Sequence, residues 1–206
     1  QHPFFEDLHT WASLLRHYQF GTPLGRDRLL AVPNQPITID ENQPEVTDTD
    51  EVTRLYIAAF GTFGENFDKS VLRDLSSLGY ECSDVGVTSV DPRTVNIRGG
   101  PSLAWLYVQE KDLKPQTTQV VMSQGMFRAL SLVIHLNYCI FRKKSRTILI
   151  DDVGEGLDFS RAQSFISLLI DRAKENGLQL LMTTNDRFVM NGVPLQYWGV
   201  IARKGS

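Results

Sequence analysis

The chain has few cysteines and no long hydrophobic run, and both features limit what it can be. Cys82 and Cys139 are the only cysteines among 206 residues, and neither has a cysteine or histidine partner at metal-ligand spacing. We therefore expect reduced thiols and no structural metal. No run reaches the roughly 18 to 20 apolar residues that a membrane-spanning helix needs, and no secretory signal pattern is present. These absences predict a cytoplasmic protein without a membrane segment.

An excess of charge of one sign is missing as well. The formal net charge is −3, and 42% of the residues are hydrophobic. This balance gives no overall attraction to nucleic acid or to anionic membranes, so binding of either would need a local patch or a partner. The length and the apolar fraction are sufficient for a real core, as one domain or as a domain with an appendage.

A phosphate-binding P-loop is also missing. Its pattern is G-x-x-x-x-G-K-[ST], in which the glycines let the backbone wrap the phosphates and the lysine reaches their oxygens. The segment from Gly64 to Ser70 contains Lys69 but has Asp68 where the last glycine must be, and Gly21 to Asp27 has no lysine. We expect this chain alone not to bind a nucleoside triphosphate tightly.

The most informative stretch that is present runs from Val121 to Asp158. Apolar residues recur at helical spacing over Met126 to Phe141 and cover much of the helix circumference, which predicts a buried helix. The run from Thr147 to Ile150 is short, β-branched and without alternation, as is typical of a central parallel strand. This strand ends in the adjacent acids Asp151 and Asp152.

The remaining elements follow from the same kinds of pattern. A second buried strand is predicted over Leu178 to Met182 and a last one from about Tyr197 to Ala202. Strand-forming clusters separated by turn residues predict a small antiparallel meander over Val85–Val90, Val95–Ile97 and Leu103–Tyr107. Helical spacing predicts four further helices and a short turn or helix: Phe4 to Tyr18, Val52 to Phe60, Lys69 to Leu78, about Arg161 to Asn176, and a segment ending at Asn191.

Two segments are predicted to be irregular. Lys111 to Thr118 is expected to be a loop. Val32 to Asp50 contains prolines and turn-forming residues, and we interpret it as a solvated connector rather than an acidic binding patch. Its acids are Asp40, Glu41, Glu45, Asp48 and Asp50.

Strand, helix and strand in succession predict an α/β fold with a mainly parallel sheet. The crossover between parallel strands is right-handed, and ligands of such sheets bind at the carboxyl ends of the strands. Asp151 and Asp152 lie at one such end, and the cluster Thr184-Asn185-Asp186 lies at the other. We divide the chain into an N-terminal helix with its connector (1–50), a helical and β-meander part (51–118) and the α/β part (119–206).

The acidic pair and a serine motif carry the candidate chemistry. Asp151, Asp152 and Asp158, which follows a Gly-x-Gly turn, place negative charge where Mg²⁺ could bind through a carboxylate, waters and phosphate oxygens. The alternative is that Asp152 or Asp158 only caps the next helix. Ser123-Gln124-Gly125 opens the buried helix, where free backbone N–H groups favour phosphate, although a serine there can also be a simple N-cap.

In order and spacing, these motifs resemble the second half of an ABC-type ATPase head, most closely the RecF-like and SMC-like AAA ATPases of bacterial phage-defence systems. The resemblance covers about residues 107–193 and implies the C-terminal lobe of a P-loop NTPase that binds ATP and Mg²⁺. It rests on four ordered motifs: Ser123-Gln124-Gly125, Ile148 to Asp152, Gly156-Leu157-Asp158 and Thr184-Asn185-Asp186.

The resemblance also implies a role for each motif residue. Asp151 is the Walker B aspartate that orients Mg²⁺, and Asp152 is at the position of the catalytic glutamate. Asn185 is at the position of the switch histidine. The remaining residues contact nucleotide held by a second subunit or lie at the dimer interface: Ser123, Gln124, Gly125 and Asp158.

Three departures from the family pattern predict slow hydrolysis. The motif Ser-Gln-Gly-Met stands where Ser-Gly-Gly-Gln is the best-known form. Asp152 reaches about 1.5 Å less far than a glutamate, which could lower the rate about a hundredfold. Asn185 can hydrogen-bond to a phosphate but cannot titrate like histidine.

The missing P-loop predicts partners. We expect the chain to be part of a larger ATPase, working with an N-terminal lobe that carries the P-loop, with a second copy of itself, and with an effector protein or DNA. The basic cluster from Arg142 to Arg146 is interpreted as a helix end rather than a DNA contact.

Two other functions fit parts of the pattern. A Toprim-like nuclease would hold two metal ions with Asp151, Asp152 and Asp158. It would also want a glutamate from an earlier strand, for which Glu110 is a poor candidate. A catalytically inactive scaffold with an ABC-like dimer surface would account for Asp152 and Asn185.

Overall fold

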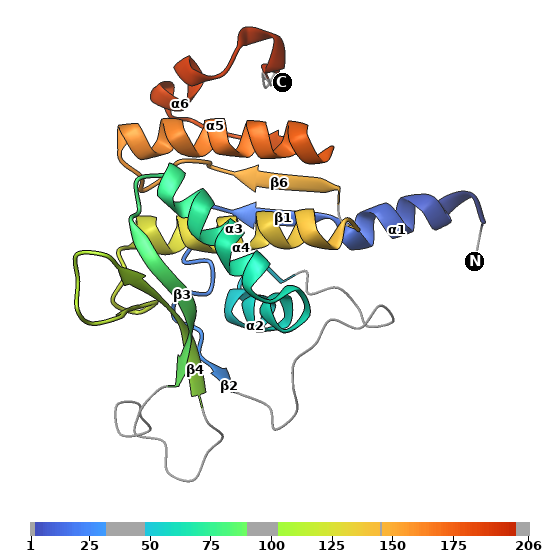
Figure 1. Cartoon of the computed structure of the whole chain (residues 1–206). Coiled ribbons are helices and arrows are strands. Elements are labelled where there is room, and N and C mark those ends of the chain that lie inside the picture. Colours follow the sequence, from blue (N-terminus) through green and yellow to red (C-terminus); the bar gives the residue numbers. More distant parts are fainter. Residues whose placement is uncertain (1–2, 32–47, 90–102, 145, 201–206) are drawn as a thin grey trace.

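The computed structural model describes residues 3–31, 48–89, 103–144 and 146–200, and its first sheet is parallel (Figure 1). This sheet has the order β1-β6-β7, in which β6 pairs with both neighbours. The predicted α/β fold with a mainly parallel sheet is confirmed at this level. Its strands are β1 (Arg16–Gln19), β6 (Thr147–Asp151) and β7 (Gln179–Met182).

The second sheet is antiparallel and has β4 at its centre. It forms part of the predicted meander, whose middle segment at Val95–Ile97 lies outside the described residues. The prediction of a loop up to Thr118 was wrong at its end, because Thr117 and Thr118 pair with β4. The strands are β2 (Leu30–Ala31), β3 (Cys82–Ser89), β4 (Leu103–Glu110) and β5 (Thr117–Thr118).

The helices confirm most of the periodicity predictions. For four of the long helices, at least one end lies within two residues of the predicted end. Among the described helices, none is long and apolar enough to cross a membrane. The helices are α1 (Glu6–Leu14), α2 (Val52–Phe63), α3 (Glu65–Ser77), α4 (Gln124–Arg142), α5 (Phe159–Asn176) and α6 (Arg187–Gly192), with the 3-10 turns η1 (Pro3–Phe5) and η2 (Leu195–Tyr197).

The prediction of a helix up to Tyr18 was wrong. The helix α1 ends at Leu14, and the chain then forms the strand β1, in which Arg16 and Tyr18 are buried while His17 and Gln19 are exposed. This period of two is the pattern of a strand. The pairing of β1 with β6 therefore brings part of the N-terminal segment into the same sheet as the acidic pair.

The predicted last strand from Tyr197 to Ala202 was also wrong over its described part. Tyr197 ends the 3-10 turn η2, which follows Pro194, and the residues up to Val200 form no strand. The N–H of Trp198 donates to the carbonyl of Leu195, which closes a turn instead of a sheet ladder. Ala202 lies outside the described residues, as do the acids Asp40, Glu41 and Glu45 of the predicted connector.

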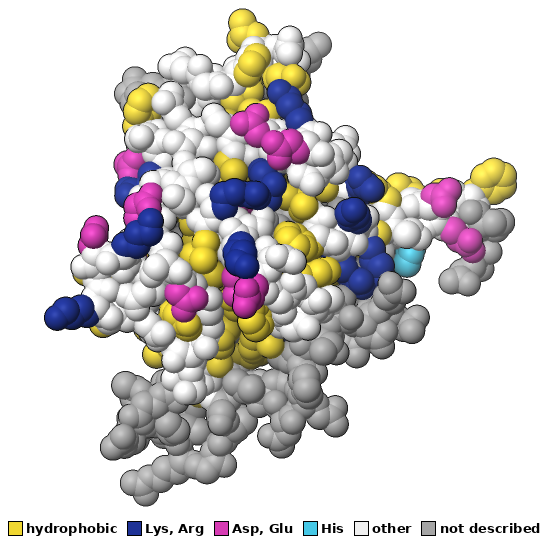
Figure 2. Space-filling view, in the orientation of Figure 1, with side chains coloured by type: hydrophobic (Ala, Val, Ile, Leu, Met, Phe, Trp, Pro, Cys, Tyr) yellow, Lys and Arg dark blue, Asp and Glu magenta, His cyan; other side chains and the backbone are white. Residues whose placement is uncertain are grey.

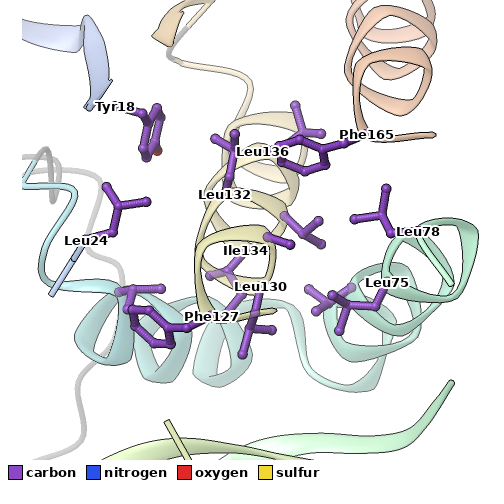
Figure 3. Packing of buried hydrophobic residues seen from close by; sticks show 14 of the residues in the cluster. Tyr18, Leu24, Leu75, Leu78, Phe127, Leu130, Leu132, Ile134, Leu136 and Phe165 are labelled. Carbon is purple, nitrogen blue, oxygen red and sulfur yellow. The ribbon is translucent and has the colours of Figure 1, made fainter. Parts of the chain in front are cut away.

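The helix α4 is the centre of the core, as its apolar circumference predicted. Every residue from Gly125 to Cys139 is buried. Figure 3 shows Leu130 and Ile134 of α4 in one cluster with Leu75 of α3 and Phe165 of α5. On the side toward β1, the ring of Tyr18 lies 4.9 Å from that of His135. Burial lowers the pKa of His135 and raises the pKa of Tyr18, so both side chains are neutral at pH 7.

A buried polar network joins three helices across this core. Asn137 of α4 donates to Asp74 of α3 at 2.8 Å and accepts from Ser70 at 2.6 Å. Arg172 of α5 donates to the carboxylate of Asp74 at 3.2 Å. It also donates to the hydroxyl of Ser70 and to the amide oxygen of Asn137. Because the hydrogen bonds of each member are directed at the others, the network fixes how α3 and α5 lie against α4.

The two faces of the parallel sheet differ in how far they are covered. Register places Tyr18, Ile150 and Met182 side by side on one face. On that face Tyr18 contacts α4, and Met182 lines a cavity with residues of α5. On the other face, in the part of the chain that the structure describes, Gln19 is exposed and Leu181 is 50% exposed. Figure 2 shows basic and acidic side chains interspersed over the surface in view.

Candidate acidic site and its helix ends

The carboxyl ends of β1, β6 and β7 meet at one edge of the parallel sheet. The register pairs Gln19 with Asp151 and Ile150 with Met182, so that Thr183 follows directly beside the acids. The sequence predicted that Asp151-Asp152 and Thr184-Asn185-Asp186 would lie at this edge. The residue that contacts Asp151 is Thr183, which directly precedes the second cluster. Gln19 was missed because its segment was predicted to be helical.

Thr183 links the two acids of the pair. Its hydroxyl donates a hydrogen bond to a carboxylate oxygen of Asp151 and accepts one from the backbone N–H of Asp152 at 3.1 Å. Its carbonyl accepts from the N–H of Val153 at 3.0 Å, and its own N–H donates to Ile150 at 2.9 Å. The turn after β6 is therefore held to the end of β7 mainly by Thr183, with a further hydrogen bond of 3.3 Å from the Thr184 hydroxyl to the carbonyl of Val153.

Asp152 has a left-handed backbone conformation. Its φ is +54°, one of three positive φ values at non-glycine residues of the described chain. This conformation costs free energy for most side chains, although aspartate tolerates it better than most, and such outliers cluster at functional sites. The carbonyl of Asp152 accepts from the N–H of Glu155 at 3.2 Å, so the strained residue begins a tight turn.

Ser123 caps α4, and the glycine that follows it packs against the acidic turn. The Ser123 hydroxyl accepts from the N–H of Met126 at 3.2 Å. Ser123 and Gln124 are exposed, whereas Gly125 is buried. A Cβ on Gly125 would lie 2.5 Å from the carbonyl oxygen of Gly156. The serine end of α4 and the turn after β6, predicted as two separate motifs, are therefore in direct contact.

Asp158 caps the next helix. Its carboxylate accepts from the N–H of Arg161 at 3.0 Å and also pairs with the Arg161 guanidinium. These hydrogen bonds lower the pKa of Asp158. The capping alternative raised from the sequence is thus confirmed for Asp158, and its role at a dimer interface stays a prediction.

Asn185 is exposed on the loop between β7 and α6. The hydroxyl of the preceding Thr184 accepts from the N–H of Asp186 at 3.0 Å, which shapes this loop. Within the described ranges, no hydrogen bond joins Asn185 to the acidic pair. Its catalytic role therefore stays a prediction.

The donors at the sheet edge suit a hard cation. Asp151, Asp152, Gln19 and Thr183 offer carboxylate, amide and hydroxyl oxygens, and Mg²⁺ is commonly held by one or two carboxylates with waters and phosphate oxygens. Over the described residues, no group of three or more His, Cys, Asp and Glu side chains could hold a metal ion. The three-carboxylate centre of the nuclease alternative is thus not formed by Asp151, Asp152 and Asp158.

Lys69, the lysine considered for a phosphate-binding loop, lies on a helix and pairs with a glutamate. Gly64 separates α2 from α3, and Lys69 lies on the exposed side of α3. Its ammonium group pairs with Glu65 at 3.0 Å, one helical turn earlier. This arrangement agrees with the conclusion from sequence that Gly64 to Ser70 is no P-loop.

Comparison with known proteins gives one distant structural likeness to report. No protein-family model matches the chain, and no curated protein matches it. Among solved structures, the chain is similar to the crystal structure of the SmcHead bound to the C-winged helix domain of ScpA, with a TM-score of 0.46 and 15% identity. The match covers 71% of this chain and 40% of that one, so this chain spans less than half of its length. At this identity and TM-score, the likeness assigns no function.

Proposed function

We propose that this chain supplies the C-terminal lobe of an ABC-type ATPase head that binds ATP and Mg²⁺, forms a dimer around the nucleotide and hydrolyses it slowly. The observation that carries the proposal is the meeting of Asp151, Asp152 and Thr183 at the sheet edge, together with the contact between Gly125 and Gly156. The acidic pair thus contacts the residue just before the motif Thr184-Asn185-Asp186, and Ser123-Gln124-Gly125 contacts Gly156-Leu157-Asp158.

Asp151 is the proposed Mg²⁺-binding residue. The hydroxyl of Thr183 fixes its carboxylate, and the amide of Gln19 lies beside it in the sheet register. A bound Mg²⁺ would neutralise the charge that develops on the phosphates. Gln19 offers an oxygen ligand of the kind that Mg²⁺ accepts, directly or through water.

Asp152 is the proposed general base. Its carboxylate would accept a proton from the water that attacks the terminal phosphate, while Asn185 would hydrogen-bond to that phosphate or to the water. The left-handed backbone at Asp152 supports this role, because strain of this kind is retained where function requires it.

The serine end of α4 is proposed to face a nucleotide held by a second copy of the chain. Ser123 and Gln124 are exposed at the start of a 19-residue helix, where unpaired N–H groups and the helix dipole favour anions. Asp158 is exposed at the start of α5, and Gly125 brings the two ends together. Each composite site would then use the acids of one subunit and the serine of the other.

A lobe with a P-loop is the proposed partner within the ATPase head. Parallel sheets are normally covered on both faces, yet Leu181 is 50% exposed, and β7 is, like β1, an edge strand of the sheet over the described residues. A cavity of about 470 Å³ lies along the same strand, between α5 and α6. An added strand and helix would extend the sheet at β7 and cover the open face.

The output of the head is proposed to be action on an effector protein or on DNA, as in the phage-defence ATPases that the sequence resembles. The helices α2 and α3 and the antiparallel sheet would carry this output, because both helices contact α4 directly and the sheet contacts both helices. The network of Asp74, Asn137 and Arg172 would transmit a movement of α5 to α3.

Nucleotide binding by the full-length gene product tests the proposal. Calorimetry should find that ATP binds in the presence of Mg²⁺ and that Asp151→Asn weakens the Mg²⁺-dependent part of this binding. Asp171→Asn, on the outer side of α5, is the matched control and should bind as the wild type does. Equal binding with and without Mg²⁺ in the wild type would contradict the role of Asp151.

The scaffold alternative predicts a different result from the same protein. Asp152 and Asn185 both differ from the family pattern, and an inactive scaffold would bind nucleotide and dimerise without turnover. Phosphate release that is abolished by Asp152→Asn would exclude the scaffold. Binding and dimerisation without phosphate release would favour it.

A further inference from the structure

Arg128 joins three separate parts of the chain. It lies on α4, is 4% exposed, and was not singled out by any motif. Its guanidinium donates to the carbonyl of Gly21 at 2.6 Å, to that of Thr22 at 3.1 Å and to that of Glu155 at 2.9 Å. The first two carbonyls belong to the loop after β1, and the third belongs to the turn after β6.

The guanidinium lies close against Gly156. Gly156 has a φ of +81°, and a Cβ built on it would lie 2.7 Å from Nη1 of Arg128. The carbonyl of the same Gly156 lies against Gly125 at the start of α4. The turn after β6 is therefore enclosed between the first residues of α4 and the arginine that follows them.

Burial of the Arg128 guanidinium disfavours its charged form. Burial lowers the pKa of Arg128, and the charge of Glu155 partly opposes this effect. The three acceptors are carbonyl oxygens, which compensate a buried cation through hydrogen bonds. Lysine could not replace it, because an ammonium group lacks the planar fork that reaches three acceptors in fixed directions.

We propose that Arg128 is a positioning residue that holds the acidic turn after β6 against the serine end of α4, so that the two halves of the site move as one unit. The effect of Arg128 on catalysis rests on the proposed function, in which Ser123 and Asp158 contact the same nucleotide of the partner subunit. The geometric part stands on the three hydrogen bonds and the two glycine contacts alone.

Hydrogen exchange on the full-length gene product tests the geometric part. In Arg128→Lys, amide exchange should rise about tenfold in residues 153–157 and 124–127 together, the change expected when charged hydrogen bonds are lost. The amides that report it are the hydrogen-bonded ones: Met126, Phe127, Val153, Glu155 and Leu157. Exchange in α3 and β3 should stay at the wild-type rate. A rise in only one of the two segments, or an equal rise throughout the protein, would overturn the proposal.

Arg26 provides a matched control. It also donates to three carbonyls, those of Gln119, Val120 and Met122. Arg26→Lys should raise exchange at residues 119–122 and leave 153–157 unchanged. If Arg26→Lys loosened residues 153–157 as much as Arg128→Lys does, the linkage assigned to Arg128 would be wrong.

A second variant covers the case in which Arg128→Lys does not fold. Gly156→Ala keeps the arginine but pushes on Nη1, and it should produce the same joint rise in both segments. Gly154→Ala carries the same kind of backbone strain, at a φ of +91°, without meeting Arg128, and it should raise exchange at 153–157 alone. ATP turnover is then read separately: Arg128→Lys should lower kcat about tenfold or more and leave the KM for ATP unchanged. If the two segments loosen together while the wild type hydrolyses no ATP, the proposed function fails and the positioning role stands.

Discussion

Gly125 and Gly156 meet backbone to backbone. The carbonyl oxygen of Gly156 lies 2.5 Å from where a Cβ on Gly125 would be, which is closer than real Cβ atoms come to a neighbouring atom. The contact joins the first turn of α4 to the turn that follows the acidic pair. A displacement of either segment must therefore move the other.

Alanine at Gly125 tests this contact. The new methyl group has to push the backbone of the turn away, so Gly125→Ala should lower the free energy of unfolding by about 1 to 3 kcal/mol. Urea unfolding followed by circular dichroism would measure the change. Gly192→Ala is the control, because nothing lies within 4 Å of a Cβ at Gly192. Equal stability of the two variants would show that the turn yields without cost.

The strained backbone of Asp152 predicts opposite effects on stability and activity. Glycine adopts a φ of +54° without steric cost. The free energy of unfolding of Asp152→Gly should therefore equal that of the wild type or exceed it by up to about 1 kcal/mol. Asp152→Asn should match the wild type, because asparagine also tolerates this conformation. Both variants should lose ATP turnover. A large loss of stability in Asp152→Gly would show that the carboxylate itself stabilises the turn.

The pair of Asp74 and Arg172 predicts a large effect far from the candidate site. The Asp74 side chain is 2% exposed and that of Arg172 is 14% exposed, so Asp74→Ala leaves a mostly buried cation with only the exposed carboxylate of Glu175, at 3.7 Å. We expect a loss of about 3 to 5 kcal/mol in the free energy of unfolding. Lys69→Ala breaks the exposed pair with Glu65 and should change stability by less than about 1 kcal/mol. Similar losses in both variants would contradict the buried network.

Cys82 predicts a pH dependence. Burial raises the pKa of its thiol from 9.0 to about 11. Because the folded pKa is the higher one, the stability that this group contributes is present below pH 9 and is lost as the pH rises toward 11. In Cys139→Ala, the rate of Cys82 alkylation in the folded protein should therefore still rise between pH 9 and 11, whereas in urea the rate should level off above pH 9. The same pH profile in both states would show that the pKa of Cys82 is ordinary.

The sequence was informative for elements whose own residues show a clear hydrophobic pattern. It was much less informative for features that depend on contacts with distant parts of the chain. The apolar circumference of α4 and the run before Asp151 predicted a buried helix and a parallel strand, because burial on all sides leaves no polar face. Gln19 and Arg128 were missed. A four-residue strand such as β1 shows its period of two only weakly beside a preceding helix, although the alternation of Tyr18 and Phe20 with polar residues was a usable signal.

Long-range hydrogen bonds leave no trace in a single sequence. The carbonyls that Arg128 contacts are backbone atoms, so no residue type at positions 21, 22 or 155 identifies them. The same is true of the left-handed conformation at Asp152, where the expected signal would be a glycine. Both features follow from how β1, β6 and β7 are placed, which only the fold determines.

Complementation between two inactive variants tests the split site most directly. Asp151→Asn disables the acidic half of each site, and Ser123→Arg disables the half that faces the partner's nucleotide. Each full-length variant alone should hydrolyse no ATP. Mixed subunits should recover about a quarter of wild-type turnover, because half of the dimers are mixed and each mixed dimer contains one intact composite site. No recovery on mixing, or full activity of either variant alone, would contradict the account.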